Sequence, residues 1–222
     1  MAGLQEEICN YLFADTAPVR SNGGLLGFWG NCQALVVQTA RGKVDISITV
    51  ANAVRDFGPD AVLVAGTAES LTSGLLPGNV IVGSHFCYFD VCFGGMSEFG
   101  RYPNEPQYYF SDDRIVSRMI DVGLSFHQGL VLSGDKVVDS RAMARKIANR
   151  FSKAKAVDME SAVVAQVCRK SAVPFVSVRV INDVPVMNEK AKSLYRQFKQ
   201  PLDETAMSAR LFDILNKTME SI

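Results

Sequence analysis

The sequence predicts an α/β fold in which a central mixed or parallel β-sheet is flanked by helices on both faces. Short segments rich in β-branched residues are bounded by Gly, Pro or Asp, and they alternate with segments whose apolar residues recur at helical spacing. The expected strands are residues 33–39, 60–65, 79–84, 129–133 and 174–181. The expected helices are residues 44–57, 112–122, 141–151, 159–171 and 203–219. Strands that alternate with helices form a sheet covered on both faces, which gives three layers.

The composition indicates one soluble domain, with small neutral ligands or other proteins as its expected partners. Of 222 residues, 48% are apolar and 21% charged, as in a globular protein with a buried core. No repeat, low-complexity tract or long linker interrupts the chain, so a single domain over residues 1–222 is expected. Lys plus Arg number 23 and so do Asp plus Glu. This balance argues against nucleic acid and anionic membranes as partners.

Targeting and metal-binding signals are weak. The first residues lack a basic flank with a continuous apolar stretch, and no apolar run is as long as a membrane-spanning helix. We therefore expect a cytoplasmic protein. The five cysteines include no CxxC pair and mostly lie among apolar neighbours, which indicates reduced core thiols. His85 and His127 are not spaced as metal ligands with Cys or carboxylates, so no metal site is expected.

Two acidic residues, Asp158 and Glu160, lie at the expected start of an apolar helix within residues 156–168. Acidic residues at a helix start cap free backbone N–H groups, and Asp158 fits this role. Glu160 fits it less well, because a carboxylate at the mouth of a buried helix loses hydration unless a hydrogen-bond donor faces it. The vicinal diol of a sugar is one such donor. Spacing alone favours capping and ligand binding equally.

A hydrophobic strand within residues 175–186 contains Arg179 and ends in Asn182 and Asp183. Because arginine almost never enters a core unpaired, an internal salt bridge is favoured over direct ligand contact for Arg179. Asp183 lies where such strands deliver side chains to a ligand, although Asp is also common in turns. The loop at residues 66–79 offers backbone N–H groups to a ligand, but it lacks the glycine spacings of dinucleotide and triphosphate sites.

Several motifs follow one another in a specific order after the acidic pair Glu6 and Glu7. They are RGKV at 41–44, GTAESL at 66–71, LPGNVIV at 76–82, SGD at 133–135, VDMES at 157–161 and VRVINDV at 178–184. In this order and spacing, the chain resembles the 5′-methylthioadenosine/S-adenosylhomocysteine nucleosidases, within the fold family of purine nucleoside and uridine phosphorylases. The resemblance covers most of the chain. It implies a three-layer nucleoside phosphorylase-like fold, and hydrolysis of one or both of these nucleosides with release of adenine.

The resemblance also implies roles for individual residues. The expected catalytic residues are Asp183, as the general acid, and Glu7, which handles the attacking water. The expected substrate-binding residues are Glu160 and Met159 at the ribose, Val137 and Val138 at the adenine, and also Thr67 and Asn182.

Elementary chemistry agrees with these roles. Cleavage of an N-glycosidic bond requires a proton on a purine nitrogen and a water molecule that attacks an oxocarbenium-like sugar. Two separated carboxyl groups can perform both tasks if one holds a proton and the other stays ionised. Glu160 would anchor the ribose hydroxyls by charge-assisted hydrogen bonds. No metal or organic cofactor is needed.

Three features depart from the family pattern. Val137 stands in place of the aromatic residue that stacks on the purine. Glu69 stands where a small glycine is expected. Only residues 1–5 precede Glu6, so we expect the first core strand of the family to lie upstream of this sequence or to be absent.

Other functions remain open. A phosphorylase would need arginines for phosphate. Its relatives carry one just before the GT-type loop, where this chain has Val64 and Ala65, so hydrolysis is preferred. Arg20 and Arg41 remain available as phosphate ligands. A non-catalytic member of the family is less favoured, because buried acids such as Glu160 have no purpose in a pure scaffold.

The 5′ substituent of the substrate is not fixed by the sequence, and an aminofutalosine-like substrate also remains open. The expected lids are residues 97–107 and 188–200, with Phe99, Tyr102, Tyr195 and Phe198 available to pack on that substituent. The related nucleosidases pair through helices beside the active site. Because residues 44–57 and 86–93 are expected to offer an apolar surface, we predict a homodimer.

Overall fold

The computed structural model describes residues 8–10, 19–21, 24–40, 42–93, 99–198 and 203–220. Glu7, Arg41 and residues 1–5 lie outside the described residues, and so does the side chain of Arg20. The expectations that concern them therefore remain predictions.

The main sheet has six strands in the order β6-β5-β7-β8-β4-β9, and β9 also pairs with β5. The strands are β4 (Val62–Ser70), β5 (Val80–Tyr88), β6 (Tyr109–Phe110), β7 (His127–Ser133), β8 (Ala154–Asp158) and β9 (Phe175–Asp183). Three pairs are parallel, namely β4–β9, β5–β7 and β7–β8, and the other three are antiparallel. The sheet is thus mixed, as predicted, and the β5–β9 pairing closes five of its strands into a ring.

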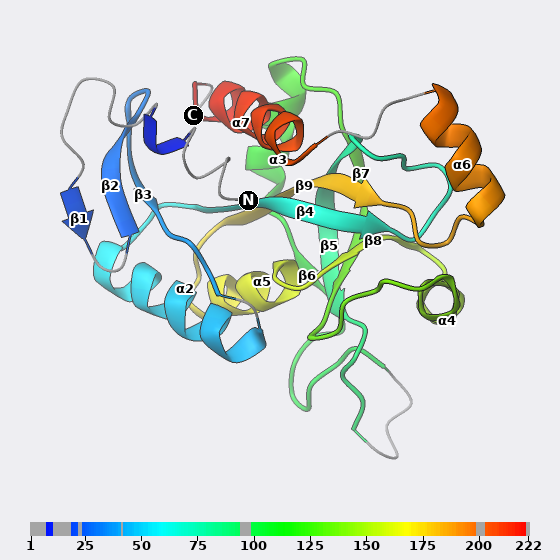
Figure 1. Ribbon diagram of the computed structural model, residues 1–222. Helices are drawn as coiled ribbons and strands as arrows, with labels where there is room; N and C mark the ends of the chain where they lie inside the picture. Colours follow the sequence, from blue (N-terminus) through cyan, green and yellow to red (C-terminus); the bar gives the residue numbers. More distant parts are fainter. Residues whose placement is uncertain are drawn as a thin grey trace.

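Helices cover both faces of this sheet (Figure 1). They are α2 (Lys43–Phe57), α3 (Asp113–Asp121), α4 (Arg141–Arg150), α5 (Ser161–Lys170), α6 (Glu189–Phe198) and α7 (Glu204–Glu220). One core cluster joins α2 and α5 to the sheet, a second joins α3 and α7, and a third lies under α4. The predicted three-layer α/β fold is therefore confirmed.

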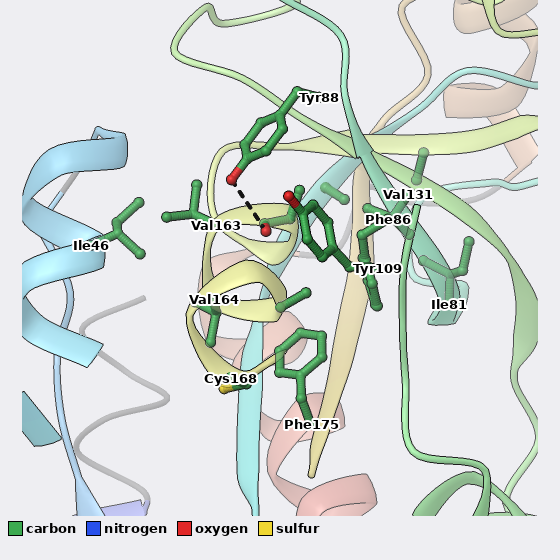
Figure 2. Close-up of a cluster of buried hydrophobic side chains, with 14 of the residues drawn as sticks. Ile46, Ile81, Phe86, Tyr88, Tyr109, Val131, Val163, Val164, Cys168 and Phe175 are labelled. Carbon is green, nitrogen blue, oxygen red and sulfur yellow. Dashed lines mark hydrogen bonds between the residues drawn. The ribbon is translucent and has the colours of Figure 1, made fainter. Parts of the chain in front are cut away.

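The first of these clusters packs α2 against α5 and the sheet. Figure 2 shows Ile46 of α2 facing Val163 and Val164 of α5, with aromatic side chains of the sheet beyond them. Tyr88 is 2% exposed, and its hydroxyl donates its hydrogen bond to Gln166 Oε1 at 2.7 Å, with the backbone oxygen of Ala162 at 3.3 Å. This bond satisfies the one polar atom of a large buried side chain, as a core tyrosine requires.

A second, three-stranded antiparallel sheet contains β1 (Val19–Ser21), β2 (Gly24–Trp29) and β3 (Cys32–Val36). The expectation that residues 33–39 belong to the central sheet was wrong, because β3 pairs with β2 by a tight turn at Gly30 and Asn31. A hairpin closes a short loop at little entropic cost, which favours the pairing of β3 with β2. In the described part of the chain, β3 and β4 are not hydrogen-bonded to each other.

Three further differences from the sequence prediction concern the segments around the site. Strand β8 was not predicted, because its sequence AKAVD is short and low in β-forming residues. Residues up to Asp158 belong to this strand, so α5 begins at Ser161 and not at residue 159.

Residues 86–93 do not form the apolar surface that the sequence predicted. Phe86, Tyr88 and Phe89 are buried in the core, and among the large apolar side chains of that segment only Phe93 is substantially exposed.

Within the described residues, none of the helices combines the length and the apolar character that a membrane crossing requires.

Candidate active site

The carboxyl ends of β4, β7, β8 and β9 meet at one side of the sheet, where a cavity of about 1050 Å³ opens. Parallel strands place the residues that leave them at a common edge, which is the usual ligand position in α/β folds. The wall of the cavity at this edge contains Thr67, Glu69, Val137, Asp158, Met159, Glu160, Arg179 and Asn182. Four of the predicted substrate-binding residues besides Glu160 thus line one cavity, although they come from separate segments of the chain.

A buried ion pair between Arg179 and Asp158 lies beneath this edge. The two side chains are 3% and 1% exposed, and Arg179 Nε lies 2.9 Å from Asp158 Oδ2. The salt bridge expected for Arg179 is therefore present. Removing both charges from water costs several kcal/mol per ion, so the pair is favourable only if its remaining polar atoms are also satisfied.

Serine hydroxyls and backbone N–H groups satisfy the Asp158 carboxylate. Ser133 donates to Oδ1 at 2.5 Å, and Ser161 donates a short hydrogen bond to Oδ2. The backbone N–H groups of Glu160 and Ser161 also donate to Oδ1, each at 3.2 Å. These two contacts are the helix-start cap that the sequence predicted for Asp158. Asp158 therefore connects β7, β8, β9 and the first turn of α5.

Glu160 is held at the cavity by the same arginine. Arg179 Nη1 lies 3.1 Å from Glu160 Oε2, and the glutamate side chain is 24% exposed. Burial raises the pKa of Glu160, while the attraction of Arg179 opposes that rise. Arg179 Nη2 is buried and has no hydrogen-bond partner in the described part of the protein. One guanidinium thus orients two carboxylates.

Glu69 is the residue that the sequence analysis noted only as a departure from the pattern. It lines the cavity at the end of β4, and burial raises the pKa of its carboxyl group to about 7. The nearby carboxylates Asp158, Asp183 and Glu160 add to this rise. The signal in the sequence was a charged residue at the end of a buried strand, where Asp183 was considered for the same reason.

The predicted general acid, Asp183, ends β9 beside Glu69 and is not among the residues that line the cavity. Its side chain is 45% exposed, and its Oδ2 lies 3.0 Å from Lys192 Nζ of α6. Asn182, the preceding residue, does line the cavity. Lys192 was not identified from the sequence, because an isolated lysine on a helix carries no signal of its partner.

The loop after β7 carries Val137 and Val138, and an ion-pair cluster fixes its position. Lys43 Nζ lies 2.7 Å from Asp90 Oδ2, and the Lys43 backbone N–H donates to Asp135 Oδ1 at 3.0 Å. The start of α2 is thereby tied to the loops that follow β5 and β7. Val137 is 56% exposed at the cavity, whereas the Val138 side chain is 2% exposed in the core under α4. The expected role of Val138 accordingly rests on its backbone alone.

The expected lid segments are partly described. Tyr102 packs edge-on against Tyr88, and the Tyr195 hydroxyl donates to the Pro77 backbone oxygen at 3.2 Å. Phe99 lies under the guanidinium of Arg150, 3.7 Å from it. The side chain of Phe198 lies outside the described residues. Each described aromatic side chain therefore already has a partner within the fold.

Comparison with known proteins identifies the class. The family model of the phosphorylase superfamily matches residues 4–214. The protein is 31% identical to the 5′-methylthioadenosine/S-adenosylhomocysteine nucleosidase of an Exiguobacterium species, over 98% of this chain and 89% of that relative. The chain therefore belongs to the phosphorylase superfamily, and within it to the 5′-methylthioadenosine/S-adenosylhomocysteine nucleosidase family.

Solved structures agree with this assignment. The S-adenosylhomocysteine nucleosidase of Streptococcus pyogenes in complex with 5-methylthiotubericidin has a TM-score of 0.83 and 26% identity, covering 99% of this chain and 93% of that one. A futalosine hydrolase of Helicobacter pylori has a TM-score of 0.84 over 100% of this chain and 95% of that one, at 23% identity. This second likeness shows the fold alone.

The buried pair generates a stability prediction. We expect Arg179→Met to lower the free energy of unfolding by about 3–5 kcal/mol, because it leaves Asp158 buried without its cation. Arg55→Met is the matched control, since Arg55 pairs with Asp56 on the surface and is 68% exposed; it should change stability by less than about 0.5 kcal/mol. Urea unfolding of both variants measures the difference. Equal losses would show that the buried pair does not stabilise this edge of the sheet.

Proposed function

We propose that this protein hydrolyses the N-glycosidic bond of 5′-methylthioadenosine, S-adenosylhomocysteine or both, and releases adenine. The observation that carries the proposal is the position of Glu160, a carboxylate held at a cavity wall by a buried arginine, in a member of a nucleosidase family. An ionised carboxylate in a partly buried site accepts strong hydrogen bonds from a vicinal diol. Such contacts fix the anomeric carbon relative to the other groups in the cavity.

The remaining roles are part of the same proposal. Met159 precedes Glu160 in the turn between β8 and α5, so both contact the ribose in this proposal. Val137, Thr67 and Asn182 line the cavity in which we place the nucleoside. The Val138 backbone contacts the base edge in this arrangement. Asp183 provides the proton for the leaving base, and Glu7 handles the attacking water. No metal or organic cofactor takes part, and we place the reaction in the cytoplasm as a step of methionine salvage.

The decisive experiment is a product assay on the purified protein. We expect adenine to appear with 5′-methylthioadenosine or S-adenosylhomocysteine at a rate that does not depend on added phosphate. A requirement for phosphate, with formation of a sugar 1-phosphate, would identify a phosphorylase instead. Adenine release from an aminofutalosine-like nucleoside alone would change the substrate but not the reaction. No release from any of the three would contradict the proposal.

We expect Asp183→Asn to reduce turnover by roughly 10²–10⁴-fold, because an amide does not supply the proton that the leaving base needs. Asp213→Asn is a close control: Asp213 also pairs with a lysine on a helix, Lys217, at 2.8 Å, and is 58% exposed. Steady-state adenine release by both variants, with circular dichroism to confirm folding, makes the comparison. If the two variants retain equal activity, Asp183 is a turn residue.

We expect Glu160→Gln to lower kcat/KM by roughly 10- to 100-fold, because a neutral amide forms weaker hydrogen bonds with the ribose hydroxyls than a carboxylate. Both KM and kcat should change, since the contact exists in the ground state and strengthens in the transition state. The parallel measurement is thermal unfolding. A variant with a lower Tm and unchanged kinetics per folded molecule would support a purely structural role for Glu160.

We also propose a homodimer that uses the outer face of α2. Val44 and Ile48 lie one turn apart on this helix and are 71% and 55% exposed. Burial of neighbouring apolar side chains in an interface removes them from water and stabilises the dimer. Sedimentation at micromolar concentration should give the mass of two chains, and Ile48→Glu should shift it to one. A monomeric wild-type protein would contradict this arrangement.

A further inference from the structure

Glu69 and Asp183 are register partners on two neighbouring parallel strands. In the pairing of β4 with β9, Ala68 is opposite Ile181, and the next residue, Glu69, is opposite Asp183. The register shifts by one residue between these pairs, so Asn182 has no counterpart on β4. Such bulges change which side chain a strand presents at its end. Here the shift sets a second carboxyl group beside the predicted general acid, on strands about 4.8 Å apart.

The charged groups around Glu69 disfavour its ionised carboxylate. Asp158 of β8, Glu160 before α5 and Asp183 of β9 all repel its ionised form. Two cations of this site are already engaged, Arg179 with Asp158 and Glu160, and Lys192 with Asp183. Lys136 also lines the cavity and is exposed. In the described part of the chain, no ion pair reaches the Glu69 carboxylate, and the hydrogen bond that favours its ionised form comes from its own backbone N–H.

The two carboxyl groups have different surroundings. Asp183 forms an ion pair with Lys192, and its side chain is 45% exposed. Burial raises the pKa of Glu69 to about 7, which favours its protonated form. Neighbouring carboxyl groups that interact strongly share protons as a unit. Glu69, the group at the cavity that has no cation in contact among the described residues, is therefore the better place to hold a proton before the reaction.

We propose that Glu69 and Asp183 act as one carboxyl pair, in which Glu69 holds the proton before the reaction and Asp183 passes it to the leaving base. The proposal rests on the nucleosidase function proposed above and adds a proton-holding residue to it. Glu69 acts through Asp183 and contacts neither sugar nor base in this scheme.

The proton moves in two steps. The O–H bond of Glu69 breaks as one forms on Asp183, which leaves Lys192 beside a neutral carboxyl group. The C–N bond of the nucleoside then breaks, its electron pair goes to the base, and the Asp183 proton forms a new N–H bond on the purine. Water adds to the anomeric carbon and loses a proton to solvent by way of the water-handling group. A proton from solvent restores Glu69, so one water is consumed and no redox partner is needed.

The pH dependence of the Glu69→Gln variant provides the first test. Wild-type kcat/KM should be high below pH about 7 and fall as the pH rises through that value, because the proton on Glu69 is then lost. Glu69→Gln should lower kcat/KM at pH 7 by at least roughly 10-fold, with a smaller loss at pH 5, where the higher hydronium concentration lets solvent supply the proton that Glu69 no longer holds. Asp121→Asn removes an exposed carboxylate at the end of α3 and should leave the profile unchanged.

Two results would overturn the proposal. One is a Glu69→Gln variant with wild-type kcat/KM and the same decline at alkaline pH. The other is a loss of the same factor at every pH, which a purely structural effect on the cavity would produce.

A direct titration separates this proposal from the proposed function. In protein with ¹³C-labelled glutamate carboxyl groups, the Glu69 signal is identified by its absence in Glu69→Gln. We expect its midpoint near pH 7, and a lower midpoint in Asp183→Asn because one repelling charge is gone. A midpoint near the ordinary glutamate value of about 4.3 would overturn the carboxyl pair even in an active enzyme. An inactive wild-type protein would overturn the nucleosidase function, whereas the titration would still decide the pair.

Discussion

The edge of the sheet that forms the site depends on the buried ion pair between Arg179 and Asp158. Both charges are almost fully removed from water, so each depends on hydrogen-bond partners from the surrounding elements. These partners include Ser133 at the end of β7, Ser161 in the first turn of α5 and Ser177 within β9. Because these partners lie far apart in the sequence, the pair can be satisfied only when β7, β8, β9 and α5 are assembled together.

This constraint places the turn between β8 and α5. Asp158 accepts hydrogen bonds from the N–H groups of Glu160 and Ser161, which fixes the backbone at Met159. Arg179 then reaches Glu160 with a second nitrogen and orients its carboxylate at the cavity. A group positioned by locked neighbours loses little entropy when a ligand binds. The ion pair is thus a structural element whose geometry determines where a ribose would be held.

The acidic residues near the cavity differ in state because their surroundings differ. Asp158 has a buried cation and several donors, whereas Glu160 shares that cation and lies partly open to the cavity. Asp183 pairs with a lysine near the surface, and Glu69 has no cation among the described residues. Hydrolysis of a nucleoside requires both neutral and ionised carboxyl groups. In this cluster, desolvation and ion pairing act on each side chain separately, and burial raises the pKa of Glu69 in particular.

The sequence by itself determined the fold class, the salt bridge of Arg179 and the cap formed by Asp158. In each case the evidence was local: apolar periodicity, a charged residue inside a hydrophobic strand, and an acidic residue at a helix start. Only the tertiary structure decided that β3 joins a separate sheet, that Lys192 pairs with Asp183, and that a shifted register sets Glu69 opposite Asp183. These features depend on which distant segments meet and in which register. That choice is made by packing and pairing over the whole chain, and no local pattern encodes it.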